Sequence, residues 1–330
     1  MTGLRWGILA TGGIAHAFTS DLRTAGLDVA AVGSRRAEAA EAFAAEFAIP
    51  RAYGSYDELV ADPDLDIVYI ATPHPHHAEN ALRALDAGKH VLLEKPFTLN
   101  AREAAVVRAR ARERGLLAME AMWTRYLPHM VRLHEILAAG TLGEIQTVFA
   151  DHTQRLSADP AHRLNALELG GGALLDLGIY PISFAWDVLG PAETITARAR
   201  LGETGADTTV ATILTHAGGA ISTSISGSRG AGPNTAHVVG TDARIDLDRI
   251  WYMPTLLRVT AADGTVLEEF DGRTEGRGMQ YQALAAERIL AAGGRDSDRL
   301  PLDESVAIMA TLDAIRAQIG VSYPTAPTQE

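Results

Sequence analysis

The sequence contains no cysteine. This absence excludes disulfide frameworks, thiolate nucleophiles, cysteine-based zinc sites and iron–sulfur clusters. Lysine is nearly absent as well: of the 29 basic residues only Lys89 and Lys95 are lysines, and the others are arginines. Because arginine supplies the general positive charge, a surviving lysine is a candidate for chemistry that needs a compact, titratable ammonium group. This count directs attention to Lys95.

Positive net charge and long apolar segments are also missing. The formal net charge is −12, so no basic field attracts nucleic acid or anionic lipid. We see no apolar run that approaches the roughly 18–20 residues of a membrane span, and the N-terminal residues lack the features of a secretory signal. At about 100–200 residues per domain, we expect a cytoplasmic protein of two domains that acts on a small molecule, with neither nucleic acid nor membrane as a partner.

The first third of the chain alternates strand-like and helix-like segments. A continuous apolar run such as 67–71 is typical of a strand that is buried on both faces of a sheet. The pattern predicts strands at 4–9, 28–32, 67–71, 90–93 and 116–119, and helices at 14–24, 37–47, 77–87 and 101–114. Such alternation favours an α/β fold with a doubly wound parallel sheet of the Rossmann type, which we assign to a domain of residues 1–122.

The character of the sequence changes near residue 123. Strand candidates then follow at 144–152, 194–201, 208–215, 220–226, 237–240, 243–247, 256–260 and 266–270, with helices at 127–138, 172–189, 279–292 and 303–319. Runs of strands joined by turn signals predict a large, mostly antiparallel, open-faced sheet in an α+β domain of residues 123–330. Because large apolar patches are rarely left exposed, we expect a homodimer through this sheet, with a tetramer as the alternative.

The segment 7–15, GILATGGIA, joins the first strand to the first helix. A dinucleotide-binding fold needs glycines here, because the turn is tight and backbone amides approach a pyrophosphate at the helix N-terminus. In the G-x-G-x-x-G register Ala10 departs from the pattern, Gly12 matches it and Ala15 is permitted. A plain strand–helix turn is the alternative interpretation. The cofactor interpretation assigns phosphate binding to Ala10, Thr11, Gly12, Gly13 and Ile14.

The end of the second strand indicates the type of dinucleotide. The chain reads Ser34-Arg35-Arg36 where NAD-selective sites usually carry an acidic residue for the ribose 2′-hydroxyl. A hydroxyl followed by two guanidinium groups suits a 2′-phosphate. The alternative is that Arg35 and Arg36 are solvated residues that open a helix. We favour NADP over NAD because the acidic residue is missing.

Residues 71–96 read ATPHPHHAENALRALDAGKHVLLEKP. The T-P-x-x-x-H, A-G-K-H-V and E-K-P motifs in this segment resemble the glucose–fructose oxidoreductase/inositol dehydrogenase (Gfo/Idh/MocA) family. Segments 119–125 and 171–180 resemble its dimeric dihydrodiol dehydrogenases and NADP-dependent D-xylose dehydrogenases. The resemblance implies a Rossmann domain, an open-faced sheet domain, a nicotinamide cofactor and a polyhydroxylated cyclic substrate. It also implies cofactor contacts from Thr72, Pro73, His77, Glu94 and Lys95.

Asp176 and Tyr180 are candidates for the chemistry of such a site. They are four residues apart on a predicted helix and therefore share one face. A nearby ammonium favours the phenolate of a tyrosine, so Tyr180 is a candidate proton donor for carbonyl reduction or acceptor for alcohol oxidation. Lys95 would supply the ammonium and contact the substrate oxygen, and Asp176 would orient these groups or bind a second hydroxyl. Many relatives carry histidine at the position of Tyr180, which favours the dihydrodiol and aldose branch over inositol-type substrates.

Trp123 and Arg125 follow the last strand of the first domain and are candidates for the wall of the substrate pocket. A structural tryptophan at the domain junction is the alternative. His74, His76 and His77 are close in sequence but lack the i, i+4 spacing of a helical metal site, so we predict no metal.

Together these residues predict an NADP-dependent oxidoreductase that transfers a hydride between the nicotinamide and a carbon of a sugar or cyclic diol. One alternative is an NADPH-dependent ketosugar reductase that works in the opposite direction. Another is a non-catalytic binding protein that senses NADP. The presence of Lys95, Asp176 and Tyr180 together argues against the sensor.

Overall fold

The computed structural model describes residues 3–324, and the chain forms two compact units. The first unit comprises the chain up to Trp123 together with Thr274–Val306. The second comprises Thr124–Arg273 together with the chain from Ala307 onward. Residues 274–306, which the sequence pattern assigned to the second domain, therefore group with the first unit.

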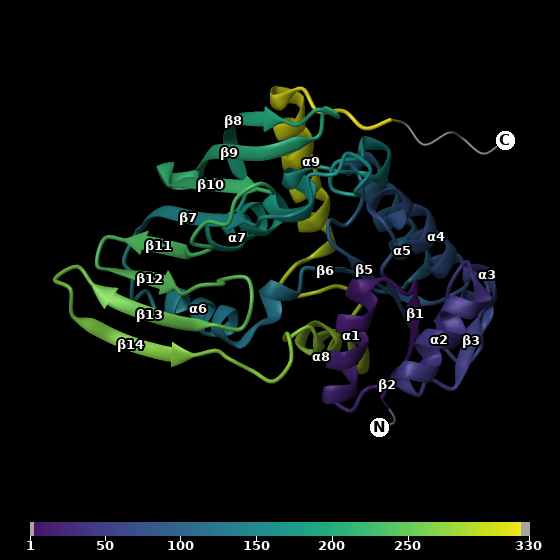
Figure 1. Ribbon diagram of the computed structural model, residues 1–330. Helices are drawn as coiled ribbons and strands as arrows, with labels where there is room; N and C mark the ends of the chain where they lie inside the picture. Colours follow the sequence, from purple (N-terminus) through teal and green to yellow (C-terminus); the bar gives the residue numbers. More distant parts are fainter. Residues whose placement is uncertain (1–2, 325–330) are drawn as a thin grey trace. The chain divides into compact units, whose positions relative to one another are not determined.

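The first unit contains a parallel sheet of six strands in the order β3-β2-β1-β4-β5-β6 (Figure 1). Its strands are β1 (Arg5–Leu9), β2 (Asp28–Gly33), β3 (Arg51–Tyr53), β4 (Ile67–Ile70), β5 (His90–Glu94) and β6 (Ala118–Ala121). This is the strand order of a doubly wound Rossmann sheet, which confirms the predicted fold. Every residue of β4 is buried, as its continuous apolar sequence indicated. The sequence pattern missed β3, because it has only three residues and none of them is buried.

Six helices described in the first unit connect or accompany these strands. They are α1 (Gly13–Thr24), α2 (Ala37–Phe47), α3 (Tyr56–Ala61), α4 (His77–Asp86), α5 (Ala101–Arg114) and α8 (Gln280–Ala291). Polar side chains set several ends: Ser55 accepts a hydrogen bond from the Glu58 amide at the start of α3, and Asn100 accepts one from the Glu103 amide at the start of α5. Gly115, with φ of +63°, ends α5.

Two polar contacts bind the returning segment 274–306 to the first unit. The carboxylate of Asp21, which is buried on α1, accepts hydrogen bonds from the backbone amides of Arg277 and Met279. The indole of Trp6 on β1 donates to Glu287 on α8 at 3.0 Å. These partners are separated by more than 250 residues of sequence, so no local pattern could have predicted the return.

The second unit contains an eight-stranded sheet in the order β14-β13-β12-β11-β7-β10-β9-β8. Its strands are β7 (Ile145–Thr153), β8 (Ala192–Leu201), β9 (Asp207–His216), β10 (Ile221–Gly227), β11 (Ala236–Gly240), β12 (Ala243–Leu247), β13 (Leu256–Ala261) and β14 (Val266–Asp271). Only the pair β7–β10 is parallel among the described strands of this sheet, and the other neighbours are antiparallel. The predicted mostly antiparallel sheet is confirmed.

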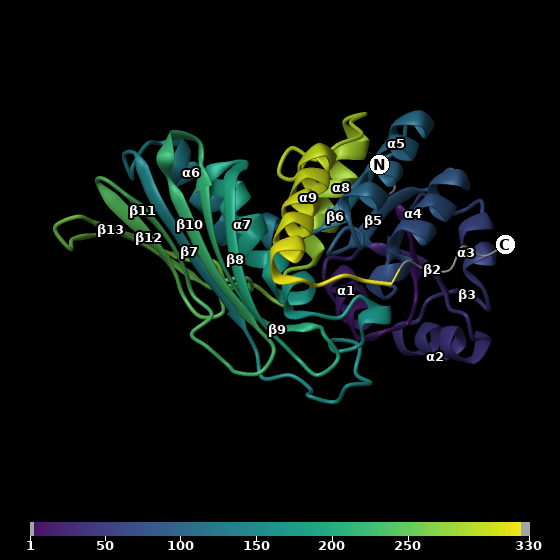
Figure 2. The ribbon, with the colours of Figure 1, turned by 90° about the horizontal axis from the view of Figure 1, so that it is seen from above.

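One face of this sheet is covered by α6 (Pro128–Ala138) and α7 (Ile179–Leu189) (Figure 2). The helix predicted at 172–189 is not uniform, because Leu174–Gly178 forms one π-helical turn before α7 begins. Gly178 lets this turn approach β10, since a Cβ there would lie 3.2 Å from the hydroxyl oxygen of Ser226. The remaining helix, α9 (Leu302–Ile319), is bound to β8 by Gln318, which contacts the backbone of Ala197.

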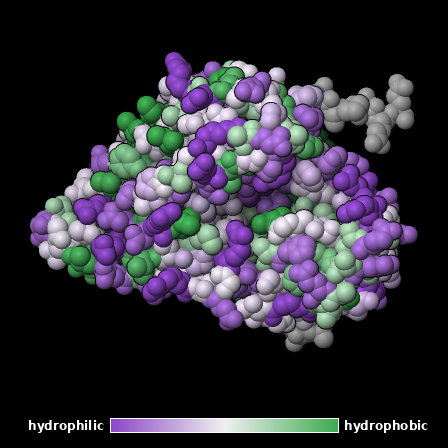
Figure 3. Space-filling model, in the orientation of Figure 1, coloured by the Kyte–Doolittle hydropathy of each residue, from purple (hydrophilic) through white to green (hydrophobic). Residues whose placement is uncertain are grey.

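The opposite face of the sheet carries exposed apolar side chains. Ile213 and Ile225 are each 51 % exposed and Phe149 is 42 % exposed, on the neighbouring strands β9, β10 and β7. Strand register aligns Ile213 and Phe149 on either side of Thr223. Figure 3 shows apolar residues over the strands interspersed with polar ones. Among the described residues no helix of this unit covers that face, so the sheet is open-faced as predicted.

One stretch, Leu167–Leu189, has the length and apolar composition that a membrane crossing would need. The stretch includes Glu168, Asp176 and Asp187, so it is not an uninterrupted apolar run. Of its most apolar window, 83 % is buried inside the protein. The stretch contains α7, whose apolar residues pack against the sheet as a core helix does.

Candidate functional site

The turn between β1 and α1 presents backbone amides without side chains in the way. A Cβ at Gly12 or Gly13 would have no described atom within 4 Å, so this turn is open. Among the described residues no side chain caps α1, and its first turn holds no acidic residue. The unsatisfied amides and the positive end of the helix dipole suit an anion such as a pyrophosphate.

Ala10 occupies the position where the dinucleotide fingerprint has its first glycine. Its φ is +84°, in the region that favours glycine, and its amide donates to the Gly33 carbonyl at 2.9 Å. Ala10 therefore adopts the backbone conformation of the glycine that it replaces, at the cost of some strain. The tight turn of the fingerprint is kept.

The end of β2 carries the residues that predicted NADP. Ser34 is buried and accepts a weak hydrogen bond from the Arg36 amide at 3.4 Å. Arg35 and Arg36 are exposed, and Arg35 also interacts with the hydroxyl of Tyr56. The three residues after Gly33 include no carboxylate to repel a 2′-phosphate.

The side chain of His77 bridges the loops that follow β4 and β5. Its imidazole is completely buried between the Thr72 carbonyl, 2.8 Å from Nε2, and the Pro96 carbonyl, 2.9 Å from Nδ1. Burial lowers the pKa of His77 to about 4, so the ring is neutral near pH 7 although two carbonyls face it. A neutral imidazole carries one N–H, so one of the two carbonyls accepts its hydrogen bond. Because the ring lies between both carbonyls, His77 positions the loops that carry Thr72 and Lys95.

The side chain of Glu94 likewise points into the interior of the first unit. It is buried, and its carboxylate accepts hydrogen bonds from the Tyr69 hydroxyl and, at 3.2 Å, from the Lys95 amide. The Tyr69 ring stacks on Phe18 of α1 with 3.8 Å between centroids. These contacts fix the backbone from which the half-buried Lys95 side chain projects.

In the second unit, Asp176 and Tyr180 lie on consecutive turns, one π-helical and one α-helical. Both are buried, at 7 % exposure each. The guanidinium of Arg163 meets both carboxylate oxygens of Asp176 at 3.3 Å. Sequence reasoning did not select Arg163, because nothing local distinguishes it from a surface arginine. A π-helical turn of this kind is common at functional sites.

Two further residues surround Tyr180 that the sequence did not indicate. The ring of His152 on β7 meets Tyr180 edge-on, with 4.8 Å between centroids. Tyr252 stacks on His152 at 3.8 Å and lies 5.4 Å from Tyr180. The available signal was the alternation along β7, where Val148, Ala150 and His152 point to the same buried face.

A glycine-rich turn precedes the helix that carries these residues. Gly172 has φ of +135°, and a Cβ there would lie 2.2 Å from Oδ1 of Asp207. The other carboxylate oxygen of Asp207 accepts a hydrogen bond from the Leu174 amide at 2.6 Å. The hydroxyl of Tyr323 donates to the Gly171 carbonyl at 2.9 Å. This turn is thus fixed in place by β9 and by the segment after α9.

The structure assigns Arg125 and Trp123 structural contacts. Arg125 is buried, forms an ion pair with Asp187 at 2.7 Å and donates to Ser183 twice, so its guanidinium is engaged by α7. Trp123 is 2 % exposed, with the guanidinium of Arg277 over its ring. The guanidinium of Arg125 thereby holds α7, the helix of Tyr180. The contacts of Arg125 and Trp123 with substrate stay predictions.

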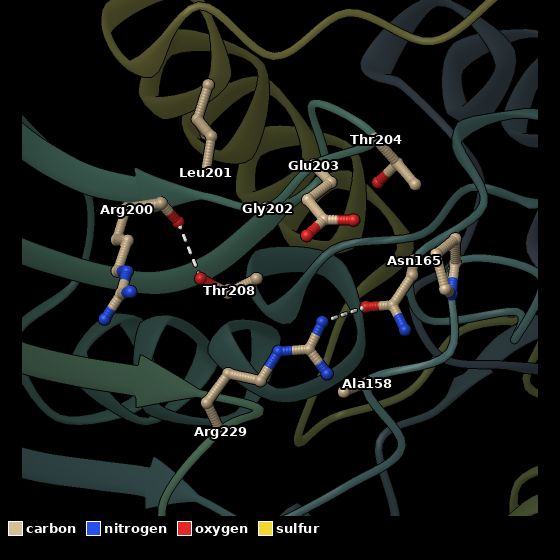
Figure 4. A pocket seen from close by; sticks show the side chains of 10 residues that line it. Ala158, Asn165, Arg200, Leu201, Gly202, Glu203, Thr204, Thr208 and Arg229 are labelled. Atoms are coloured by element: carbon tan, nitrogen blue, oxygen red, sulfur yellow. Dashed lines mark hydrogen bonds between the residues drawn. The ribbon is translucent and has the colours of Figure 1, made fainter.

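A cavity of about 450 Å³ lies elsewhere in the second unit (Figure 4). Its polar groups largely contact one another: Arg229 points toward Asn165, to which it donates at 2.9 Å, and the Thr208 hydroxyl donates to the Arg200 carbonyl. None of the predicted site residues lines this cavity. Within residues 3–324 no group of three or more metal-binding side chains comes together.

The predicted site residues thus gather into two groups, one in each unit. Those of the first unit lie at the carboxyl ends of its parallel strands, where open α/β sheets bind their ligands. They are Ala10, Thr11, Gly12, Gly13, Ile14, Ser34, Arg35, Arg36, Thr72, Pro73, Glu94 and Lys95. Asp176 and Tyr180 lie together in the second unit with Arg163, His152 and Tyr252.

Comparison with known proteins agrees with this architecture. Residues 4–122 match the family described as "Oxidoreductase family, NAD-binding Rossmann fold", and residues 130–246 match "GFO/IDH/MocA C-terminal domain". A mouse trans-1,2-dihydrobenzene-1,2-diol dehydrogenase is 40 % identical, over 97 % of this chain and 98 % of that protein. The D-xylose 1-dehydrogenase (NADP(+)) of Hypocrea jecorina is 36 % identical, over 97 % and 93 %.

Solved structures of similar proteins share the whole fold. The 3-ketoreductase KijD10 from Actinomadura kijaniata, crystallised with NADP and TDP-benzene, is 29 % identical with a TM-score of 0.84. The match covers 96 % of this chain and 98 % of that chain. An aldose-aldose oxidoreductase from Caulobacter crescentus has a TM-score of 0.86 at 23 % identity, over 96 % and 97 % of the two chains, a likeness of fold alone.

Proposed function

This chain belongs to the GFO/IDH/MocA oxidoreductase family, and we propose that it transfers a hydride between NADP and a carbinol carbon of a sugar or cyclic diol. The observation that carries this proposal is full-length similarity to dehydrogenases of a diol and of an aldose, combined with the Ser34-Arg35-Arg36 sequence after β2. The family membership and the complete set of Lys95, Asp176 and Tyr180 favour an enzyme over a binding protein that only senses NADP.

The residues present fit an NADP cofactor. The amides at the start of α1, next to Gly12 and Gly13, would hold the pyrophosphate, and Arg35 and Arg36 would hold the 2′-phosphate. Thr72 and Pro73, which His77 holds in place, would border the nicotinamide end. When bound, the nicotinamide supplies the hydride acceptor or donor.

The chain itself must move one proton for each hydride. We propose that the Tyr180 hydroxyl is the group that exchanges this proton with the substrate oxygen. Lys95 donates a hydrogen bond to the same oxygen and favours the phenolate by its charge. Asp176, held by Arg163, binds a neighbouring substrate hydroxyl, which orients a polyol relative to Tyr180.

Reduction of a ketosugar is the second candidate function. It is favoured by the similarity in sequence and fold to KijD10, whose name describes a 3-ketoreductase. The same residues serve both directions, because a proton donor for reduction is the proton acceptor for oxidation.

We further propose that two copies associate through the open face of the eight-stranded sheet. Exposed Phe149, Ile213 and Ile225 support this, because they lie on adjacent strands and together form an apolar surface. We also propose a cytoplasmic location, which the match to an NAD-binding oxidoreductase family supports.

The experiment that tests the activity is a substrate panel followed by absorbance of the reduced cofactor. Purified protein is mixed with NADP⁺ and a series of aldoses and cyclic diols, and with NADPH and ketosugars. We expect turnover of at least one aldose or diol, with NADP preferred to NAD. Turnover of ketosugars alone would establish the second candidate, and cofactor binding without any turnover would contradict both.

A further inference from the structure

Three aromatic rings close around one another in the second unit, and only one of them is used by the proposed chemistry. His152, Tyr180 and Tyr252 are 2 %, 7 % and 7 % exposed. His152 presents its edge to Tyr180 at an interplanar angle of 75° and lies nearly parallel to Tyr252 at 26°. Each ring contacts the other two, so a displacement of any one requires the others to move.

The orientation of His152 is set by a neighbour on the same strand end. The side-chain amide nitrogen of Gln154 lies 2.8 Å from Nε2 of His152 and 3.4 Å from the Tyr252 hydroxyl. Stacking on Tyr252 and the contact with Gln154 together restrain the tilt and rotation of the imidazole.

Tyr252 does not take part in the proton exchange proposed for Tyr180. Burial raises the pKa of Tyr252 to about 12, so its hydroxyl stays protonated near pH 7. Tyr252 therefore contributes a rigid ring and no charge to this cluster.

We propose that His152 is a positioning residue for Tyr180, and that its ring, restrained by Gln154 and Tyr252, holds the phenol at the angle that proton transfer requires. This inference rests on the proposed function, since it acts through Tyr180. It gives a role to a histidine that neither the sequence motifs nor the proposed mechanism uses. Displacing a reacting group by about 1 Å can lower the rate by about 10²-fold.

The first test replaces His152 with alanine and with phenylalanine. His152→Ala should lower kcat by about 10²-fold, because the Tyr180 ring loses its edge contact. The NADPH dissociation constant, measured by fluorescence, should not change, because Arg35, Arg36 and the α1 turn are untouched. His152→Phe restores a flat ring and should recover most of the lost kcat. An unchanged kcat in His152→Ala overturns the inference.

The second test asks whether His152 acts through Tyr180. In a Tyr180→Phe background, His152→Ala should lower kcat no further, because the group that it positions is already gone. Equal losses in the two backgrounds would show a merely structural role and overturn only this inference. A wild-type kcat in Tyr180→Phe alone would overturn the assignment of Tyr180 itself, and this inference with it.

A matched control separates positioning from stability. His216 is also a buried histidine of this sheet, with its ring nitrogens on the Gly190 carbonyl and the Ser222 hydroxyl, beside the far end of α7. His216→Ala should lower the melting temperature and leave kcat at 25 °C unchanged. If His152→Ala does not fold, Gln154→Ala keeps all three rings and removes the contacts of the amide with the imidazole and with the Tyr252 hydroxyl. It should lower kcat by a smaller factor, and an unchanged kcat there counts against the inference.

Discussion

Tyr180 and Lys95 carry the proposed proton transfer, so substitutions that delete only the functional group of each residue are the most direct test. Tyr180→Phe keeps the ring among His152 and Tyr252 and deletes the hydroxyl. Lys95→Met keeps most of the stem and deletes the charge. Each should lower kcat by about 10²–10⁴-fold, the usual contribution of a positioned acid–base group. Steady-state kinetics and cofactor titration measure this, and NADPH affinity should change far less.

The double variant gives an additional check on the same pair. Because the two groups serve one step, Tyr180→Phe with Lys95→Met should be little slower than the slower single variant. If the fold-decrease in kcat of the double variant equals the product of the two single decreases, the two residues act at different steps. A near-native kcat in Tyr180→Phe would move the proton to another group, such as Asp176.

Cofactor choice is also decided by single residues. Arg35→Ala combined with Arg36→Ala should weaken NADPH binding by about 1.5–3 kcal/mol, or roughly 10–150-fold. NADH, which lacks the 2′-phosphate, should bind nearly as before. Fluorescence titration with both cofactors measures the difference, and Arg102→Ala removes an exposed positive charge from α5 as a control. Equal weakening of both cofactors would contradict the assignment.

At the scale of elements, the turn before α7 depends on a buried carboxylate. Burial raises the pKa of Asp207 to about 6, because desolvation outweighs the hydrogen bonds from the backbone. The folded protein therefore binds this proton more tightly than the unfolded chain does. The contribution of Asp207 to stability is greatest below about pH 4 and falls as the pH rises to about 6, by up to about 3 kcal/mol.

This dependence is best measured against a variant that cannot ionise. Asp207→Asn retains an oxygen that accepts from the Leu174 amide. We expect the free energy of unfolding of Asp207→Asn to rise relative to wild type between about pH 4 and 6 and then to level off. Wild type alone would not isolate Asp207, because the buried histidines His77 and His129 also titrate. Their pKa values are lowered to about 4, so they destabilise the folded state as the pH falls. Subtracting the unfolding free energy of wild type from that of Asp207→Asn cancels this contribution. A difference that stays constant from pH 4 to 7 would rule out the ionisation of Asp207 as its source.

At the scale of the whole molecule, the open sheet face predicts association. Light scattering at micromolar concentration should give at least twice the chain mass of 35.1 kDa. Ile213→Asp combined with Ile225→Asp places charges in the centre of the proposed contact and should shift the mass to that of one chain. Val106→Asp changes an exposed apolar residue of α5 and should leave the mass unchanged. A monomeric wild type would remove the argument for a dimer.

Much of the fold could be predicted because its signals are local. The buried strand β4 is a continuous apolar run, α5 begins at Asn100 and ends at Gly115, and the bounds predicted for α2 and α5 agree with the structure. The residues proposed to carry the chemistry could also be selected from the sequence, because Lys95, Asp176 and Tyr180 lie in motifs of neighbouring residues. The strained Ala10 was visible as a departure from the fingerprint, although its positive φ was not.

The sequence by itself determined the two kinds of sheet, the cofactor turn and the residue types that the proposed chemistry uses. These follow from periodicity, turn residues and short motifs, whose physical causes act within a few residues of the chain. Only the tertiary structure decided that 274–306 returns to the first unit, that Arg125 is engaged by α7, and that Arg163 pairs with Asp176 while His152 packs against Tyr180. Such contacts join distant parts of the chain, and a buried polar group takes whichever partner the packed elements bring within hydrogen-bond distance.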